Sequence, residues 1–342
     1  MYKKQIKYLY CLVSSPKDVF YEQAYISIIS LKIHMPDAYI ILFTDNETII
    51  SIKKRKADIR NIVDEIIFEY FDNKISNLKR SRILKTLMRN KVDGDFLYID
   101  SDTIITDDLS DIQNSDIEIG AVLEDHTYLS QYALYKPTRL KFIKKMFKVR
   151  NFNYGYDFKI YFNGGVFFCK DCKAGYDFFN EWHRLWLQCF ELKLLNDQAS
   201  LNQANFNVGN TIKELDGIWN CQLIHDGSLK YFHKAKIIHY FTTNIQEKYF
   251  LLANREYTQK IKETGIIDQE TIDMLKNAKS QFAPNTRVML VNPALNDFYD
   301  SAICGAAKRL YHTKAGGVFE VILSAIKRAI FTPLRKKIFL RK

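Results

Sequence analysis

Residues 96–102 read Phe-Leu-Tyr-Ile-Asp-Ser-Asp, an apolar run that ends in two acidic residues. In an extended chain residues two apart face the same side, so Asp100 and Asp102 can present their carboxylates to one point while Ser101 faces elsewhere. A hard cation such as Mg²⁺ or Mn²⁺ would neutralise such a pair and keep coordination positions open for diphosphate oxygens. The stretch therefore predicts a divalent-metal site, with a solvated pair of acids in a turn as the alternative.

Strand-like and helix-like segments alternate around this stretch. Apolar, β-branched runs predict strands at residues 7–13, 39–44, 62–68, 96–99 and 117–123, and apolar residues at helical spacing predict helices at 19–33 and 77–89. A second region has predicted strands at 161–169 and 235–240, and the pattern turns helical after residue 246. Such alternation is typical of an α/β protein with a mostly parallel sheet, in which ligands bind at the carboxyl ends of the strands.

The composition is that of an ordinary globular protein, with 47% hydrophobic and 26% charged residues. Of the net charge of +11, residues 308–342 carry +9, from ten Lys or Arg and one acid, which leaves +2 for the other 307 residues. A basic tail on a nearly neutral body argues against a nucleic-acid partner. We found no signal-peptide pattern and no apolar run of the roughly 20 residues that span a membrane. The six cysteines lie among apolar neighbours, so we expect reduced thiols and no disulfides.

An Asp-x-Asp after an apolar strand also opens the active site of haloacid-dehalogenase-type phosphatases, in which the first Asp is a nucleophile. That class normally carries the motif on its first strand and has Thr or Val at the fifth position of the motif. Here the motif lies on about the fourth predicted strand, and Ile104 holds the fifth position. The phosphatase interpretation therefore ranks below the metal site.

Six short motifs occur in an order and at approximate spacings known from one family. They are Arg82, Asp100-Ser101-Asp102, Phe162-Asn163-Gly164-Gly165-Val166, Asp197-Gln198 with Leu201-Asn202, Trp219-Asn220 and Ile238-His239-Tyr240. Over about residues 5–245 the chain resembles glycosyltransferase family 8, retaining and metal-dependent enzymes of the GT-A fold. The family includes bacterial lipooligosaccharide galactosyltransferases and glucosyltransferases, and glycogenin.

The resemblance implies a Rossmann-like, mostly parallel mixed sheet flanked by helices. It places a GT-A catalytic domain at residues 1–245, with a nucleotide-binding half at 1–125 and an acceptor-side half at 126–245. A helical C-terminal region would follow at 246–342.

The resemblance also assigns the metal and the reacting groups. Asp100, Asp102 and His239 would be the protein ligands of Mn²⁺, with Mg²⁺ as the alternative, since a nitrogen ligand suits Mn²⁺ better. Asp197 would hold hydroxyls of the donor sugar, and Gln198 would lie beneath the anomeric carbon. An amide is a poor nucleophile, so we expect front-face attack with retention, in which the leaving phosphate accepts the proton of the acceptor hydroxyl.

Further residues would surround a UDP-sugar donor. Arg82 corresponds to an arginine near the nucleotide, and Lys85, one turn along the helix, is either a second diphosphate contact or part of a solvated basic face. Asp45 is a candidate ribose or base contact, although Asp-Asn is also ordinary turn chemistry. The segment that would cradle uracil contains Ser14, Ser15 and a stacking aromatic, Phe20 or Tyr21. The remaining candidates would contact the donor or the acceptor: Ser101, Asp125, Asn163, Gly164, Gly165 and Asn202.

Two positions depart from the family pattern. No lysine follows His239 at the usual distance, and Lys248 would replace it only if the loop shifts. Ala199 stands where many relatives carry a second aspartate. The sequence therefore leaves open the donor sugar and the residue that contacts the diphosphate from this loop.

The basic tail, residues 315–342, contains a predicted amphipathic helix at 317–331. Its polar stripe consists of Glu320, Ser324, Lys327 and Arg328, and Pro333 should end it. The tail predicts either an anchor to anionic lipid or a helix docked on the enzyme's own core. The anchor would place a cytoplasmic protein on the inner face of the inner membrane.

The expected function is transfer of a hexose from UDP-galactose or UDP-glucose to a hydroxyl of a lipooligosaccharide or another cell-surface glycan. An inactive glycan-binding or scaffold protein of the same fold is the alternative from a different class. The phosphatase is the third interpretation.

Overall fold

The computed structural model describes residues 6–153, 159–223, 226–241, 249–284, 301–311, 313, 315–318 and 321–325. The chain divides into two compact units. The first consists of Met1–Leu129 and Met146–Val288, and the second of Ser130–Lys145 and Met289–Lys342. Both sheets of the described chain lie in the first unit.

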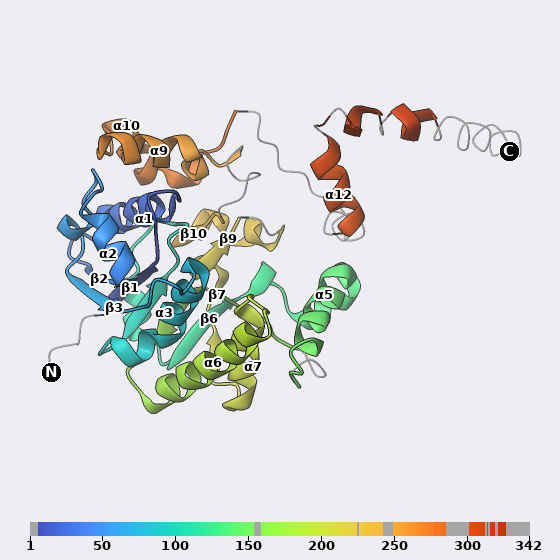
Figure 1. Cartoon of the computed structure of the whole chain (residues 1–342), viewed down its shortest axis with the longest axis horizontal. Coiled ribbons are helices and arrows are strands. Elements are labelled where there is room, and N and C mark those ends of the chain that lie inside the picture. The colour runs from blue at the N-terminus through green and yellow to red at the C-terminus, as the bar shows by residue number, and fades with distance from the viewer. Residues whose placement is uncertain are drawn as a thin grey trace, which may run out of the picture. The chain divides into compact units, whose positions relative to one another are not determined.

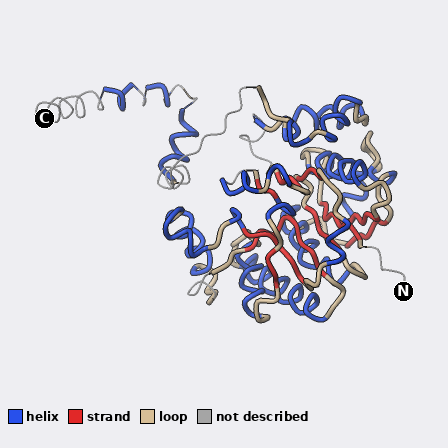
Figure 2. The backbone as a smooth tube through the Cα atoms, turned by 180° about the vertical axis from the view of Figure 1, so that it is seen from behind, coloured by secondary structure: helices blue, strands red, loops and turns tan. Residues whose placement is uncertain are grey.

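A seven-stranded sheet of order β3-β2-β1-β4-β7-β6-β8 forms the centre of the first unit (Figures 1 and 2). Its strands are β1 (Lys7–Leu12), β2 (Tyr39–Asp45), β3 (Glu65–Glu69), β4 (Phe96–Ile99), β6 (Ile119–Leu123), β7 (Phe162–Cys169) and β8 (Ile212–Glu214). The pairs β1–β2, β1–β4, β2–β3 and β6–β8 are parallel, whereas β7 runs antiparallel to both of its neighbours, β4 and β6. The predicted α/β class with a mostly parallel mixed sheet is confirmed.

A smaller sheet, of order β5-β10-β9, follows directly from the acidic motif. It contains β5 (Thr103–Ile105), β9 (Cys221–Gln222) and β10 (Ile237–His239). The sequence predicted β10, because it lies within a longer strand-like run at 235–240. It predicted neither β5 nor β9, whose two or three residues belong to no predicted run and show no periodicity by themselves. These two strands nevertheless determine where the end of β10 lies.

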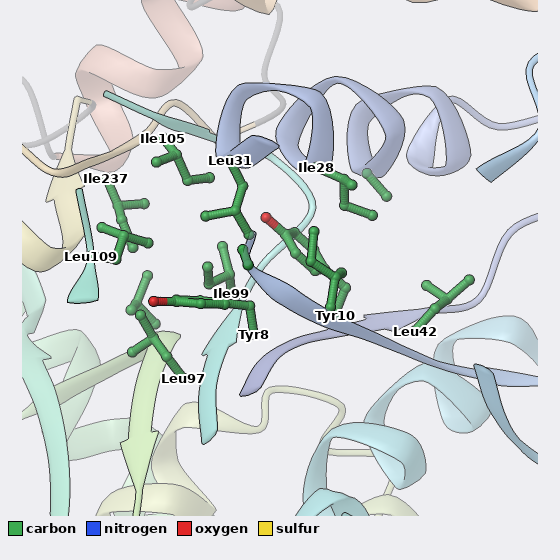
Figure 3. Close-up of a cluster of buried hydrophobic side chains, with 14 of the residues drawn as sticks. Tyr8, Tyr10, Ile28, Leu31, Leu42, Leu97, Ile99, Ile105, Leu109 and Ile237 are labelled. Carbon is green, nitrogen blue, oxygen red and sulfur yellow. The ribbon is translucent and has the colours of Figure 1, made fainter. Parts of the chain in front are cut away.

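Two buried clusters cover the two faces of the large sheet, because successive strand residues point to opposite sides. Tyr8, Tyr10, Leu97 and Ile99 pack with Ile28 and Leu31 of α1 (Phe20–His34) on one face (Figure 3). On the other face, Leu9, Phe96, Tyr98 and Phe167 pack with residues of α3 (Asn77–Lys91) and α6 (Lys173–Glu191). Phe167 is fully buried and stacks on Phe178, with ring centroids 5.5 Å apart.

The helices of the first unit are α1 (Phe20–His34), α2 (Asn46–Ile52), α3 (Asn77–Lys91), α6 (Lys173–Glu191), α7 (Gln198–Asn207), α9 (Arg255–Thr264) and α10 (Gln269–Lys276). Helix α4 (Leu129–Tyr135) begins at Leu129, the last residue of the first segment of the first unit. Helix α5 (Pro137–Lys148) ends in the second segment of that unit. Helix α12 (Ala302–Tyr311) belongs to the second unit. Single 3₁₀ turns occur at Ile59–Asn61, Ser110–Asn114, Glu124–His126, Gly217–Asn220, Asp226–Lys230, Phe232–Lys234, Leu251–Ala253 and Ala278–Ser280.

The segment that follows residue 249 belongs to the first unit through α9 and α10, which pack against α1. The Lys262 ammonium donates to the carbonyl of Asp18 at 3.0 Å. Most of the predicted amphipathic tail, residues 319–320 and 326–342, lies outside the described residues. No helix of the described chain is both long and apolar enough to cross a membrane.

Phe167 tests how far the stability of the large sheet depends on packing against α6. Replacing Phe167 by Ala should lower the free energy of unfolding by about 3–5 kcal/mol, because a fully buried ring leaves a cavity. The control is Phe68→Ala on β3, where the ring is 60% exposed and the cost should stay within about 0.5 kcal/mol. Urea unfolding followed by circular dichroism gives both free energies of unfolding. Equal losses in the two variants would contradict the role of Phe167 in packing the sheet against α6.

Candidate active site

The candidate site lies where β4 of the large sheet passes into β5 of the small one. Asp100 and Asp102 fill this junction, and the N–H of Asp100 donates to the carbonyl of Gly165 on β7 at 2.8 Å. β10 runs antiparallel to β5, with His239 opposite Thr103. The N–H of Tyr240 donates to the carbonyl of Asp102 at 3.1 Å. This pairing brings a histidine from late in the chain beside the acidic motif.

Asp100, Asp102 and His239 form a group of potential metal ligands. Each offers one ligand atom, and these atoms lie within 4.8 Å of one another. His239 is buried, and its Nε2 lies 3.2 Å from Oδ1 of Asp102. Two carboxylates and an imidazole are a suitable donor set for Mn²⁺, with its borderline preference between oxygen and nitrogen.

A chain of amide hydrogen bonds fixes the orientation of the His239 ring. The backbone N–H of Gly165 donates to Oδ1 of Asn163 at 2.8 Å, and Nδ2 of Asn163 donates to the Glu124 carboxylate at 2.7 Å. Asn220 therefore presents its Nδ2 to the same Asn163 oxygen, at 2.9 Å, and turns its own Oδ1 toward Nδ1 of His239, at 3.0 Å.

The direction of this chain has a chemical consequence for the imidazole. A backbone N–H can only donate and a carboxylate can only accept, so both amides are oriented from fixed ends. Asn220 then offers an acceptor to Nδ1, which places the proton of a neutral His239 on Nδ1 and the lone pair on Nε2. Nε2 is the nitrogen that faces Asp102. The residues present therefore fit a divalent metal held by Asp100, Asp102 and His239.

Gly165 is required by the same arrangement. A Cβ added at this position would lie 2.7 Å from Nδ1 of His239 and 2.9 Å from Oδ1 of Asn163. Both neighbours are held by the amide chain, so neither can move without breaking it. The predicted importance of Gly165 thus has a steric origin.

Two cations of α3 lie against the acids. The Lys85 ammonium binds both carboxylate oxygens of Asp100, at 3.1 and 3.3 Å, and the Tyr98 hydroxyl donates to the same carboxylate. Burial, followed by the charge of Asp100, raises the pKa of Tyr98 well above its usual value, so the phenol stays protonated as a donor. Arg82 lies 3.3 Å from Asp197, which raises the pKa of the guanidinium.

These groups line one pocket of about 270 Å³, here called the acidic pocket. It contains the three metal-ligand candidates, the two cations of α3, part of the glycine motif and the start of α7. Its lining residues are Arg82, Lys85, Asp100, Asp102, Asn163, Gly164, Gly165, Asn196, Asp197, Gln198, Leu201, His239 and Phe241. Nε2 of Gln198 is buried and has no hydrogen-bond partner among the described residues, so this amide group can donate to a ligand in the pocket.

Two residues predicted as nucleotide contacts, Tyr21 and Asp45, have fully buried side chains that contact other parts of the protein. The Tyr21 hydroxyl donates to the carbonyl of Ala57 at 2.6 Å, and the ring offers no face to a base; its neighbour Phe20 is the exposed aromatic. Asp45 caps α2 by accepting from the N–H of Thr48 at 2.7 Å, and its other oxygen lies 3.1 Å from Nε of Arg80.

Asn202 is also structural. Its side-chain amide accepts from the N–H of Phe162 at 2.8 Å and donates to the carbonyl of Phe162 at 3.1 Å, so it attaches α7 to the start of β7. Asp125 is buried on a left-handed backbone, φ 58°, and its N–H donates to Gln222. Neither these two residues nor Ser101 lines the acidic pocket.

Ser14 and Ser15 lie just beyond the carboxyl end of β1, the same edge of the sheet as Asp100. Both hydroxyls donate to Asp18, at 2.6 and 2.9 Å, and the carbonyl of Ser15 accepts from Arg55 at 2.6 Å. They do not line the acidic pocket. A uracil contact at this loop stays a prediction.

The sequence missed several residues of the site or gave them no role. Asn220 appears in the sequence pattern without a function, and Glu124 is only the neighbour of the candidate Asp125. Asn196 and Phe241 line the acidic pocket, yet each is only the neighbour of a motif residue. Lys248, considered as a diphosphate contact, lies outside the described residues.

No family model matches the chain, and no curated protein matches it in sequence. Solved structures resemble it at low identity. The glycosyltransferase GlyE of Streptococcus pneumoniae is 15% identical, with a TM-score of 0.45, over 84% of this chain and 66% of GlyE, so the match spans slightly less than two thirds of that protein. An active-site mutant of LgtC is 14% identical, with a TM-score of 0.47, over 78% of this chain and 98% of LgtC.

The galactosyltransferase LgtC, in complex with donor and acceptor sugar analogs, is 12% identical, with a TM-score of 0.45, over 78% of this chain and 99% of LgtC. These structures are glycosyltransferases, the class that the sequence resemblance implied. At these identities an activity for the present chain has to be argued from its own residues.

Asn220 offers a test of the amide chain. Replacing Asn220 by Leu removes the acceptor for Nδ1 of His239, so the ring loses its fixed tautomer and Mn²⁺ affinity should fall about 10–100-fold. Titration followed by Mn²⁺ electron paramagnetic resonance measures the affinity, and ¹⁵N spectra of the imidazole report the tautomer.

The matched control is Asn90→Leu, an exposed asparagine on α3 that hydrogen-bonds Asn180. It should leave both readouts unchanged. An Asn220→Leu protein that keeps the wild-type Mn²⁺ affinity and the proton on Nδ1 of His239 would contradict the proposed role of the amide hydrogen bonds.

Proposed function

We propose that this chain is a glycosyltransferase that moves a hexose from UDP-galactose or UDP-glucose to a hydroxyl of a lipooligosaccharide or another cell-surface glycan, with retention of configuration. The observation that carries the proposal is the acidic pocket. It combines a set of three metal-ligand candidates with two cations and with Gln198, whose buried amide nitrogen has no partner among the described residues. A sugar diphosphate matches these groups, because it presents anionic oxygens beside neutral hydroxyls.

The metal assigned to this site is Mn²⁺, with Mg²⁺ as the alternative. When bound by Asp100, Asp102 and His239, a divalent cation would stabilise the charge that grows on a diphosphate leaving group. The protein's own cations support the same charge, since Arg82 and Lys85 line the pocket.

Asp197 and Gln198 have separate roles in this proposal. Asp197 is ion-paired with Arg82, and its carboxylate oxygens can accept hydrogen bonds from sugar hydroxyls. Gln198 begins α7, and its carbonyl oxygen and amide nitrogen can orient the sugar without forming a covalent bond, because an amide is a poor nucleophile. Front-face attack, in which the leaving phosphate takes the acceptor's proton, needs no further base from the protein.

Turnover with a panel of UDP-sugars tests the function. Release of UDP should be fastest with UDP-galactose or UDP-glucose, should require Mn²⁺ and should stop when EDTA is added. Asp102→Asn should abolish the Mn²⁺-dependent rate because it removes one metal ligand, whereas Asp93→Asn, an exposed acid ahead of β4, should not change it.

Each competing interpretation has its own outcome in this assay. An inactive glycan-binding or scaffold protein would bind without any metal-dependent release of UDP. A phosphatase would release phosphate from simple esters and ignore UDP-sugars. Either result would overturn the proposal.

We further propose that the basic tail attaches the enzyme to anionic lipid on the cytoplasmic face of the inner membrane. The described parts of the tail support this, because Val318, Val321, Ile322 and Leu323 are at least 49% exposed. Ten of the 35 residues from 308 onward are Lys or Arg. Exposed apolar residues next to basic ones are typical of interfacial anchors.

Vesicle sedimentation tests the anchor. The full chain should sediment with vesicles that contain phosphatidylglycerol and remain in solution with pure phosphatidylcholine, and high salt should release it, because the attraction is partly electrostatic. A protein that lacks residues 315–342 is the matched control. Equal sedimentation of the two proteins would show that the tail is not the anchor.

A further inference from the structure

A second pocket, of about 550 Å³, lies between the segment that follows α5 and the helices α6 and α7. Amide side chains dominate its lining, together with one cation and two apolar residues. The lining residues are Arg150, Asn151, Phe152, Asn153, Leu185, Gln188, Gln203 and Asn207. The volume falls within the range of about 300–1,000 Å³ that is usual for small-molecule sites.

The amides at the base of this pocket have fixed directions. Asn207 donates to the Glu181 carboxylate at 2.6 Å, so its Oδ1 is left to accept from Nε2 of Gln203, also at 2.6 Å. Gln203, which is 2% exposed, donates from the same nitrogen to Oδ1 of Asn153 at 2.6 Å. Hydrogen bonding to Arg184 lowers the pKa of Glu181, which keeps this end of the network charged and accepting.

The network determines which polar groups at the exposed side of the pocket can hydrogen-bond a ligand. Because the oxygen of Asn153 faces Gln203, its N–H₂ group is the end that can donate to a bound molecule. Asn151 and Gln188 are exposed and add amides that both donate and accept. Phe152, half-buried, and Leu185 add apolar surface beside these groups.

The cation of the pocket is directed away from any ligand. The guanidinium of Arg150 donates to the carbonyl of Met146 at 2.8 Å and to those of Leu194 and Asn196 at 3.3 and 3.2 Å. Its Nε has no hydrogen-bond partner among the described residues but is buried, and the residue as a whole is 5% exposed. A phosphate or carboxylate would therefore lack a free charged partner here, whereas a ligand with many neutral hydroxyls would find paired donors and acceptors.

We propose that this second pocket binds a neutral saccharide. Vicinal hydroxyls both donate and accept, as the amides of Asn151, Asn153 and Gln188 do, and the C–H face of a sugar ring suits the apolar surface of Phe152. The pocket lies along α7 from the active-site pocket, since Gln198 begins that helix and Gln203 and Asn207 follow about one and a half and two and a half turns later. Arg150 connects the two pockets by holding the carbonyl of Asn196, which lines the acidic pocket.

The role of the saccharide depends on the proposed transferase activity. With that activity, the site would hold part of a glycan acceptor at a distance from the hydroxyl that reacts. Binding at a remote subsite raises affinity for long acceptors over short ones. The binding itself does not depend on turnover and can be measured separately.

Saturation-transfer NMR with the full-length chain tests the site directly. The probes are lactose, cellobiose and maltose, with glucose 6-phosphate as a charged comparison. At least one neutral disaccharide should give a signal that exceeds that of glucose 6-phosphate. An Asn153→Ala, Gln188→Ala double variant should weaken its affinity at least five-fold, and because both side chains are exposed, the variant should fold normally by circular dichroism.

The matched control is Asp100→Asn, Gln198→Ala, which changes the acidic pocket and should leave the disaccharide signal intact. Absence of any signal, a signal unaffected by the Asn153 and Gln188 substitutions, or a signal lost in the control would each overturn the second site. Loss of UDP release with disaccharide binding retained would instead refute the transferase and leave the saccharide site standing.

Discussion

The antiparallel pairing of β5 with β10 is the constraint on which the candidate site depends. It joins Thr103 to His239 in register, and so sets an imidazole beside a carboxylate that lies 137 positions earlier in the sequence. The two strands have three residues each, too few to be stable alone. Their stability comes from neighbours: β9 extends the sheet, and Ile104 and Ile238 are fully buried in a cluster with residues of α9 and α10. The arrangement of the candidate metal ligands therefore depends on helices that lie far from Asp100 and Asp102 in the sequence.

The sequence predicted the frame of the large sheet well, because its long strands are continuous apolar runs separated by amphipathic helices. β4 was predicted to the residue, at 96–99, and the others to within three residues at each end. The short strands β5, β8 and β9 were not predicted, because two or three residues show no period by themselves and, unlike β10, these strands do not lie within a longer strand-like run. The insertion of β7 between β4 and β6 also could not be read from local pattern, because strand order depends on contacts between distant segments.

The candidate residues fall into two groups: some line the acidic pocket, and others are buried and bonded to other parts of the protein. Asp100, Asp102, Asp197 and Gln198 line one pocket, as the spacing and the family resemblance implied. Tyr21 and Asp45 carry polar groups suited to a nucleotide, but the Tyr21 hydroxyl is hydrogen-bonded within the protein, and Asp45 caps α2 and forms an ion pair with Arg80. An aspartate at the end of a strand can bind a ligand or cap the helix that follows, and the sequence does not distinguish the two. The amide hydrogen bonds that connect Glu124 with His239 could not be predicted from the sequence, because asparagines have many structural roles and the sequence does not distinguish among them.

The charges of the acidic pocket give a reason why, in the proposed function, an anionic donor would bind together with a divalent cation. Its lining includes three carboxylates, from Asp100, Asp102 and Asp197, and two cations, from Arg82 and Lys85, which with a neutral His239 leaves one net negative charge. A pocket of that sign repels a diphosphate. A divalent cation would reverse the sign to one net positive charge, and the pocket would then attract the same anion. With the proposed function, the candidate metal ligands rather than the two basic side chains would therefore determine whether the pocket accepts an anionic donor, because the basic side chains are already matched by acids.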